Sequence, residues 1–142
     1  MKFNNDMLRL YAVTDRHWTG EKTLYEQVRD VLMGGATCLQ LREKDLDEAS
    51  FYEEAKNIKE LCRLFDVPFI INDNVMLAKE IDADGVHVGQ DDMACVKARE
   101  ILGPDKIIGV SAHTIEEARI AKEQGANYLG VGAIFPTSSK DD

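Results

Sequence analysis

The stretch from Pro68 to Val88, PFIINDNVMLAKEIDADGVHV, carries the pattern that predicts the fold. Residues 68–71 are apolar and β-prone, which is typical of a short buried strand. A helical pattern follows at 75–81, and a second short apolar run occupies 85–88. A strand, a helix and a strand in this order form a crossover unit, so we predict that the two strands are parallel.

The same alternation continues on both sides of this stretch. Apolar residues at helical spacing and two capping boxes, Thr23 to Glu26 and Thr114 to Glu117, predict the intervening helices. Gly34-Gly35, Gly103-Pro104 and Gly125 are expected to end three of them. The further predicted strands are 8–13, 37–41, 107–110 and 127–131. Two further helices are predicted over 51–65 and 93–102, and two more are predicted to begin after Thr23 and after Thr114.

Six strands alternating with helices fit either an open doubly wound sheet or part of an eight-stranded barrel. No Gly-x-Gly-x-x-Gly turn follows the first strand, which disfavours a dinucleotide-binding sheet. We therefore predict an α/β fold, a (β/α)8 TIM barrel with about six β/α units present, forming a single domain over residues 1–142. Because such barrels run to about 200 residues or more, two units are expected to be missing. Open edge strands are then expected to make the fold fragile.

The composition narrows the classes of function. The 26 acidic and 17 basic residues give a net charge of −9, which repels nucleic acid and anionic lipid. No apolar run approaches the ~20 residues of a membrane span, and the N-terminus lacks a secretory pattern. The widely spaced Cys38, Cys62 and Cys95 are typical of packed, reduced thiols. We expect a cytoplasmic protein without nucleic-acid or membrane partners.

Polar residues gather where the predicted strands end. Barrel enzymes build their sites from the loops at the carboxyl ends of the strands. Five such segments are rich in polar residues: 40–44, 72–74, 87–92, 111–113 and 136–140. Since these strand ends lie on one face of a barrel, the five segments are expected to converge there.

The first of these segments suits a phosphate ligand. Arg42 and Lys44 are two residues apart in an extended segment, so both side chains can point the same way. Arg offers a planar fork to phosphate oxygens, and Lys offers a compact charge. Lys140, beside Thr137 and Ser139, is expected to add a third cation at the opposite rim.

Two aspartates predict a metal site. Asp73 and Asp92 follow neighbouring predicted strands. Two carboxylates together with substrate phosphates make the usual partial coordination shell of Mg²⁺. Either residue alone is more simply explained as a helix cap, and 42–44 alone as a charged loop. The convergence of all five segments favours a functional site.

The three histidines are not assigned a functional role from the sequence. His87 lies inside a predicted strand, where a packed and hydrogen-bonded histidine is commoner than a catalyst. His17 and His113 receive no role.

Six strings of residues stand out, in order from Leu10 to Lys140: Tyr11 to Asp15, Gln40 to Lys44, Ile71 to Asp73, Gly85 to Gln90, Gly109 to Thr114, and Pro136-Thr137 with Lys140. Together these strings resemble the thiamine phosphate synthase family. The resemblance implies a transferase that joins hydroxymethylpyrimidine diphosphate to the ring nitrogen of a thiazole phosphate. The products would be thiamine phosphate and diphosphate.

The resemblance also implies roles for individual residues. The pyrimidine diphosphate would be held by Gln40, Leu41, Arg42, Glu43, Lys44, Asn72, Ser111 and Lys140. Arg42, Lys44, Ser111 and Lys140 would carry the catalysis. Thr137, Ser138 and Ser139 would touch the thiazole partner, and Asp73 and Asp92 would hold Mg²⁺. The family usually has Thr at the position of Ser139.

Two alternative functions stay open from the sequence. A thiazole tautomerase-like barrel would transfer a proton without a diphosphate site. A catalytically incomplete fragment would bind the pyrimidine diphosphate with little or no synthesis. Whether the chain forms a homo-oligomer also stays open.

Overall fold

Six parallel strands form one sheet in the computed structural model, which describes residues 1–90 and 95–138. The strands are β1 (Tyr11–Val13), β2 (Cys38–Leu41), β3 (Phe69–Asn72), β4 (Gly85–Val88), β5 (Ile107–Ala112) and β6 (Tyr128–Val131). Their order in the sheet follows the chain, and every neighbouring pair is parallel. The parallel α/β class predicted from the sequence is confirmed.

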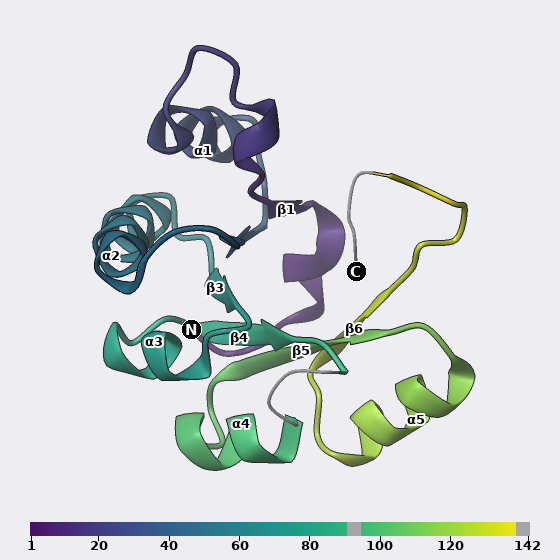
Figure 1. Ribbon diagram of the computed structural model, residues 1–142. Coiled ribbons are helices and arrows are strands. Elements are labelled where there is room, and N and C mark those ends of the chain that lie inside the picture. Colours follow the sequence, from purple (N-terminus) through teal and green to yellow (C-terminus); the bar gives the residue numbers. More distant parts are fainter. Residues whose placement is uncertain (91–94, 139–142) are drawn as a thin grey trace.

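Among the described residues, five α-helices follow one another in an arc around the outer side of the sheet (Figure 1). They are α1 (Leu24–Met33), α2 (Glu48–Leu64), α3 (Val75–Glu80), α4 (Cys95–Leu102) and α5 (Ile115–Glu123). Two short 3₁₀ helices are η1 (Asn5–Arg9) and η2 (Arg16–Trp18). The sheet curls with its concave side away from the helices, and η1 lies on that concave side (Figure 1).

The two predicted capping boxes form to different extents. At α1, the Thr23 side chain accepts from the backbone of Glu26, and the Glu26 side chain accepts from the backbone of Thr23. At α5, Thr114 likewise accepts from the N–H of Glu117 at 3.0 Å. The Glu117 carboxylate, however, accepts from the N–H of His113 at 2.7 Å, one residue further back. Both helix starts are therefore confirmed, with an altered return contact at α5.

Several predicted boundaries need correction, among them the following. The first strand is only three residues long, because the side chain of Asn4 accepts from the N–H of Asp6 and starts η1. Helix α2 begins at Glu48, before the predicted range, and ends at Leu64, so Phe65 is its C-cap and not part of its apolar face. Strand β5 continues to Ala112, two residues beyond the prediction. The predicted helix start at 93 lies outside the described residues.

Side chains alternate between the two faces of the sheet, as the strand period of two requires. The outer face packs against the helices with a fully apolar layer: Leu39, Leu41, Phe69, Ile71, Val86, Val88, Ile108 and Val110. At the amino ends of the strands, the concave face carries a smaller cluster: Met7, Cys38, Ile70, Ile107 and Tyr128. The three cysteines are buried and unpaired, as predicted.

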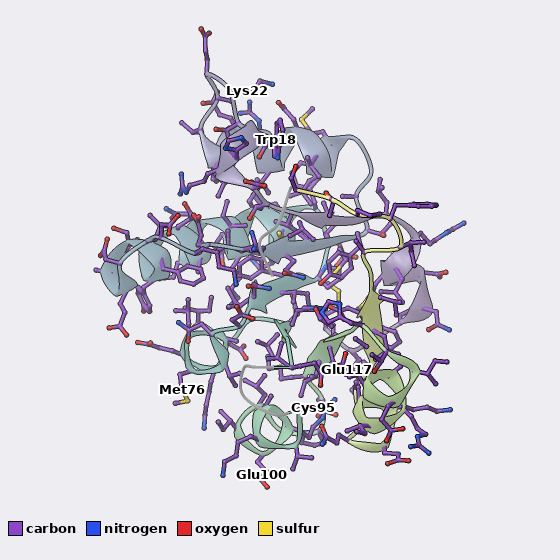
Figure 2. The ribbon with its side chains drawn as sticks, turned by 45° about the vertical axis from the view of Figure 1, so that its right-hand side comes forward. Trp18, Lys22, Met76, Cys95, Glu100 and Glu117 are labelled. Atoms are coloured by element: carbon purple, nitrogen blue, oxygen red, sulfur yellow. The ribbon has the colours of Figure 1, made fainter. Side chains whose placement is uncertain are left out.

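Residues at the periphery project outward. Figure 2 shows Lys22, Met76 and Glu100 pointing away from the body of the molecule, from the turn before α1 and from α3 and α4. In the part of the chain that the structure describes, no helix is both long and apolar enough to cross a membrane.

Candidate functional site

A cavity of about 580 Å³ lies on the concave side of the sheet, bordered by the carboxyl ends of the strands. Its polar lining comes from Tyr11, Gln40, Arg42, Lys44, Asn72, Asp73, His87, Ser111, His113, Tyr128 and Thr137. Parallel strands bring their carboxyl ends to one edge, so residues as far apart in the chain as Gln40 and Thr137 meet here. The predicted convergence of the five polar segments is confirmed for those of their described residues that line the cavity.

The predicted site residues divide into three groups. Gln40, Arg42, Lys44, Asn72, Asp73, Ser111 and Thr137 line the cavity. Leu41, Glu43 and Ser138 do not: Leu41 is packed in the outer apolar layer, Glu43 is turned toward Arg16, and Ser138 is exposed. Asp92, Ser139 and Lys140 lie outside the described residues. Leu41 points the other way because it is one residue from Gln40 in the same strand.

Lys44 and Asp73 form an ion pair at the rim of the cavity. The Lys44 Nζ lies 2.6 Å from Asp73 Oδ2 and 3.2 Å from Asn72 Oδ1. Asp73 has a left-handed backbone with φ of 66°, and its N–H donates to the His87 carbonyl at 2.8 Å. The N-cap of α3 is Asn74, whose side chain accepts from Leu77. The simpler reading of Asp73 as a helix cap is therefore wrong, and its carboxylate faces the cavity instead.

Thr14 clamps the backbone of Arg42. Its hydroxyl accepts from the Arg42 N–H at 2.9 Å and donates to the Arg42 carbonyl at 3.3 Å. The side chain of Thr14 is buried, which fixes this contact between the ends of β1 and β2. Thr14 thus holds the start of the loop that carries Arg42 and Lys44, a role that the sequence analysis did not assign.

The same loop is fixed from behind by a charged cluster. The Arg16 Nε donates to both carboxylate oxygens of Glu43, at 3.0 and 2.7 Å, and its terminal nitrogen contacts Glu54 on α2. Within the described residues, one oxygen of Glu54 is buried and has no hydrogen-bond partner. Burial, reinforced by the neighbouring Glu43 carboxyl, raises the pKa of Glu54 to about 8. The Arg16 guanidinium opposes this rise, and the raised pKa favours the protonated form of Glu54 at neutral pH.

A continuous chain of hydrogen bonds crosses the floor of the cavity. It takes one side chain from each of the six strands: Asn72, Gln40, Tyr11, Tyr128, His87 and Ser111. The distances are 2.8 Å from Asn72 to Gln40, 2.8 Å from Gln40 to Tyr11, 3.1 Å from Tyr128 to His87 and 2.8 Å from His87 to Ser111. Tyr11 and Tyr128 join through their hydroxyls. The prediction that His87 is packed and hydrogen-bonded is confirmed.

Tyr11 and Tyr128 were missed as site residues. Their spacing could have identified them, because they fall on the same alternating positions as Gln40, His87 and Ser111, which face the cavity. Burial raises the pKa of both phenols, so both hydroxyls keep their protons at neutral pH.

The described part of the site supplies one carboxylate for a cation. Among residues 1–90 and 95–138, no group of three or more His, Cys, Asp or Glu could hold a metal by itself. Mg²⁺ commonly uses one or two carboxylates and takes further oxygens from substrate phosphates and water. Asp73 at the cavity rim fits that requirement, and the fit depends on a phosphate ligand.

Comparison with known proteins gives consistent results. The sequence pattern of a family described as thiamine monophosphate synthase matches residues 10–142. The chain is 53% identical over 134 residues to a thiamine-phosphate synthase of Clostridium acetobutylicum, covering 94% of this chain and 64% of that one. It is 52% identical over 133 residues to a thiamine-phosphate synthase of Desulfitobacterium hafniense, with the same coverage.

A solved structure shares the fold. Thiamine phosphate pyrophosphorylase from Pyrococcus furiosus superposes with a TM-score of 0.85 at 44% sequence identity. The alignment covers 92% of this chain and 63% of that one. The chain therefore spans slightly less than two thirds of the length of these relatives.

Proposed function

The chain belongs to the thiamine monophosphate synthase family, and on that premise we propose that its cavity binds the pyrimidine diphosphate substrate of thiamine phosphate synthesis. The activity proposed for the protein is transfer of the pyrimidine methylene group to the ring nitrogen of a thiazole phosphate, with release of diphosphate. In this proposal residues 1–142 are a single domain of a (β/α)8 barrel, and the protein is cytoplasmic.

The observation that carries the proposal is the meeting of Arg42, Lys44 and Asp73 at one cavity. The two cations come from a loop clamped by Thr14 and Glu43, so they are held ready before a ligand arrives. Preorganised cations stabilise negative charge that builds up on a leaving group. The bond to diphosphate can break early, because an electron-rich aminopyrimidine stabilises the positive methylene carbon. The reaction then needs no strong base.

Mg²⁺ would be held by Asp73 and, in the proposal, by Asp92. Bound there, the cation would neutralise charge on the diphosphate. Lys44 now shares the Asp73 carboxylate at 2.6 Å. A diphosphate would offer Lys44 a second anionic partner, which leaves carboxylate oxygens of Asp73 for the metal. Gln40, Asn72 and Ser111 would supply neutral hydrogen bonds to the same substrate.

The thiazole partner would lie at the opposite rim. Thr137 lines the cavity and is proposed to contact it, together with Ser138 and Ser139. Lys140 is proposed to act with Arg42 and Lys44 on the diphosphate. The roles proposed for Leu41 and Glu43 would be limited to their backbones, because their side chains point elsewhere.

A tautomerase-like proton transfer is the competing enzyme function. A proton transfer of this kind does not need two cations beside a carboxylate. In addition, the relatives that align with most of this chain are named thiamine-phosphate synthase. Incubation of the protein with Mg²⁺ and both substrates, followed by chromatography, separates the candidates. Thiamine phosphate supports the synthase. Binding of the pyrimidine diphosphate without product supports a binding fragment, and failure to bind it contradicts the proposal.

The metal assignment is tested by Asp73→Asn. The variant should lose most of the Mg²⁺-dependent part of pyrimidine diphosphate binding, measured by titration calorimetry, because an amide is a much weaker ligand for Mg²⁺ than a carboxylate. Asp66→Asn is the matched control, since Asp66 also has a left-handed backbone, with φ of 56°, and does not line the cavity. Equal metal dependence in Asp73→Asn and the control would exclude Asp73 as a ligand.

A further inference from the structure

In the hydrogen-bond chain across the cavity floor, Lys44 fixes at one end which group donates and which accepts. Lys44 is an ammonium, which can only donate, so the Asn72 atom 3.2 Å from it must be the amide oxygen. Asn72 then presents its NH₂ group to Gln40, whose oxygen accepts at 2.8 Å. Gln40 in turn donates from its NH₂ group to the hydroxyl of Tyr11 at 2.8 Å.

The direction continues through the two tyrosines. Because Tyr11 accepts from Gln40, its own proton goes to the hydroxyl of Tyr128. Tyr128 then donates its proton to Nδ1 of His87 at 3.1 Å. In the opposite direction, Tyr11 would accept twice, and its proton would have no acceptor within the part of the chain that the structure describes. Because the contact between the two hydroxyls is partly buried, that arrangement is costly.

The tautomer of His87 follows from this direction. A neutral imidazole that accepts at Nδ1 carries its proton on Nε2. That Nε2–H points at the Ser111 hydroxyl 2.8 Å away, so the Ser111 oxygen is an acceptor. The remaining proton of Ser111 is then directed away from His87, and Ser111 lines the cavity.

We propose that this one-way chain holds His87 as the Nε2–H tautomer and thereby presents Ser111 to the cavity as a hydrogen-bond donor for a diphosphate oxygen. His87 and Tyr128 are positioning residues that act through Ser111. The ligand named here rests on the proposed function, whereas the direction of the chain rests on the hydrogen bonds alone. The opposite direction would turn a lone pair of Ser111 toward an anion.

Two glycines give the rings the room that this arrangement needs. In register, His87 on β4, Gly109 on β5 and Tyr128 on β6 form one row across the concave face. A Cβ atom at Gly109 would overlap the Tyr128 ring, so glycine there lets the ring cross β5 and reach His87. At Gly130, a Cβ atom would lie 3.1 Å from the His87 ring. The two glycines therefore leave the space in which the rings of Tyr128 and His87 lie side by side.

The tautomer can be measured without any substrate. ¹⁵N NMR of the ligand-free protein at about pH 8, where an ordinary histidine is neutral, should show His87 protonated at Nε2 and unprotonated at Nδ1. Tyr128→Phe removes the donor to Nδ1, so a second, Nδ1–H form should appear. Tyr11→Phe is the matched control, because Tyr128 keeps its proton for His87, and the Nε2–H form should persist.

Binding of inorganic diphosphate with Mg²⁺ gives the functional readout. Tyr128→Phe should weaken binding by about threefold to tenfold, the size expected for one hydrogen bond. Ser111→Ala should weaken it at least as much, and Ser111→Thr, which keeps a hydroxyl, should restore most of the loss. In the Ser111→Ala background, Tyr128→Phe should have no further effect, since it acts through that hydroxyl.

Several results would overturn the inference. These are an Nδ1–H or doubly protonated His87 in the unchanged protein, a Tyr128→Phe protein that keeps only the Nε2–H form, or additive effects of Tyr128→Phe and Ser111→Ala. Additivity would mean that Tyr128 acts only through packing. If the unchanged protein binds no diphosphate, the proposed function fails. The NMR result still decides whether the hydrogen-bond chain has the stated donor-to-acceptor direction.

Discussion

The two faces of the same six strands differ in what they contribute. On the outer face, alternate residues such as Phe69, Ile71 and Val86 form a continuous apolar layer under the helices. On the concave face, the residues between them include Asn72 and His87, which are hydrogen-bonded to neighbours on other strands. One residue step along a strand thus separates core packing from the candidate site.

This difference has a physical basis. Apolar side chains on the outer face are stabilised by removal from water without regard to direction. Polar side chains on the concave face are stable in burial only when each donor meets an acceptor, so their partners are specified. The outer face should therefore dominate stability, and the concave face should dominate ligand binding. Substitutions on the two faces can test that division.

The largest effect is expected on the outer face. Phe69→Ala should lower the free energy of unfolding by about 3–5 kcal/mol, because it leaves a cavity where a fully buried ring was packed. Denaturant titration followed by circular dichroism measures the loss. Asn72→Ala, three residues later on the concave face, should cost less stability than Phe69→Ala and should weaken diphosphate binding more. Equal losses of stability in the two variants would contradict the division.

An intermediate effect is expected at the cavity rim. Arg42→Ala should weaken binding of inorganic diphosphate by about 1.5–3 kcal/mol, the range for charge-assisted hydrogen bonds. Stability should change little, and titration calorimetry measures the binding. Arg63→Ala is the control, because Arg63 is an exposed arginine of α2 paired with Glu60. If Arg42→Ala altered only binding of the unphosphorylated pyrimidine, the polarity assigned to the site would be reversed.

A pH-dependent effect is expected from the charged cluster of Arg16, Glu43 and Glu54, which lies behind the loop. Because the folded pKa of Glu54, about 8, lies above the ordinary value of a glutamate, the folded state retains this proton more strongly. The stability gained from it is complete below about pH 4 and is lost as the pH rises toward 8. Glu54→Gln should remove this loss, so the variant gains stability relative to the unchanged protein between about pH 5 and 8.

Thermal unfolding across that pH range measures the effect. Glu53→Gln, at the exposed neighbouring position of α2, is the control and should keep the pH dependence of the unchanged protein. An identical pH dependence in Glu54→Gln would mean that Glu54 is ionised in the folded protein throughout the range. The cluster of Glu54, Glu43 and Arg16 would then hold the loop through charge alone.

Local patterns accounted for much of the fold. The start of α1, set by Thr23, and the bounds of β4 were predicted to the residue, because each depends on a few neighbouring side chains. The first strand was predicted too long, since an apolar run does not distinguish a strand from a short 3₁₀ turn. The length of β5 was underestimated because its last residues are held by pairing with β6, a contact formed far along the chain.

For the site, the sequence by itself determined which residue types follow the strands, and hence the cations and the carboxylate of Arg42, Lys44 and Asp73 at one face. The periodicity of a strand is local, so the sequence alone predicts which of these residues share a face. Only the tertiary structure decided that Tyr128 reaches both Tyr11 and His87, and that the Glu43 side chain turns away from the cavity. Those contacts depend on the curl of the sheet and on the space above Gly109, which join residues from opposite ends of the chain.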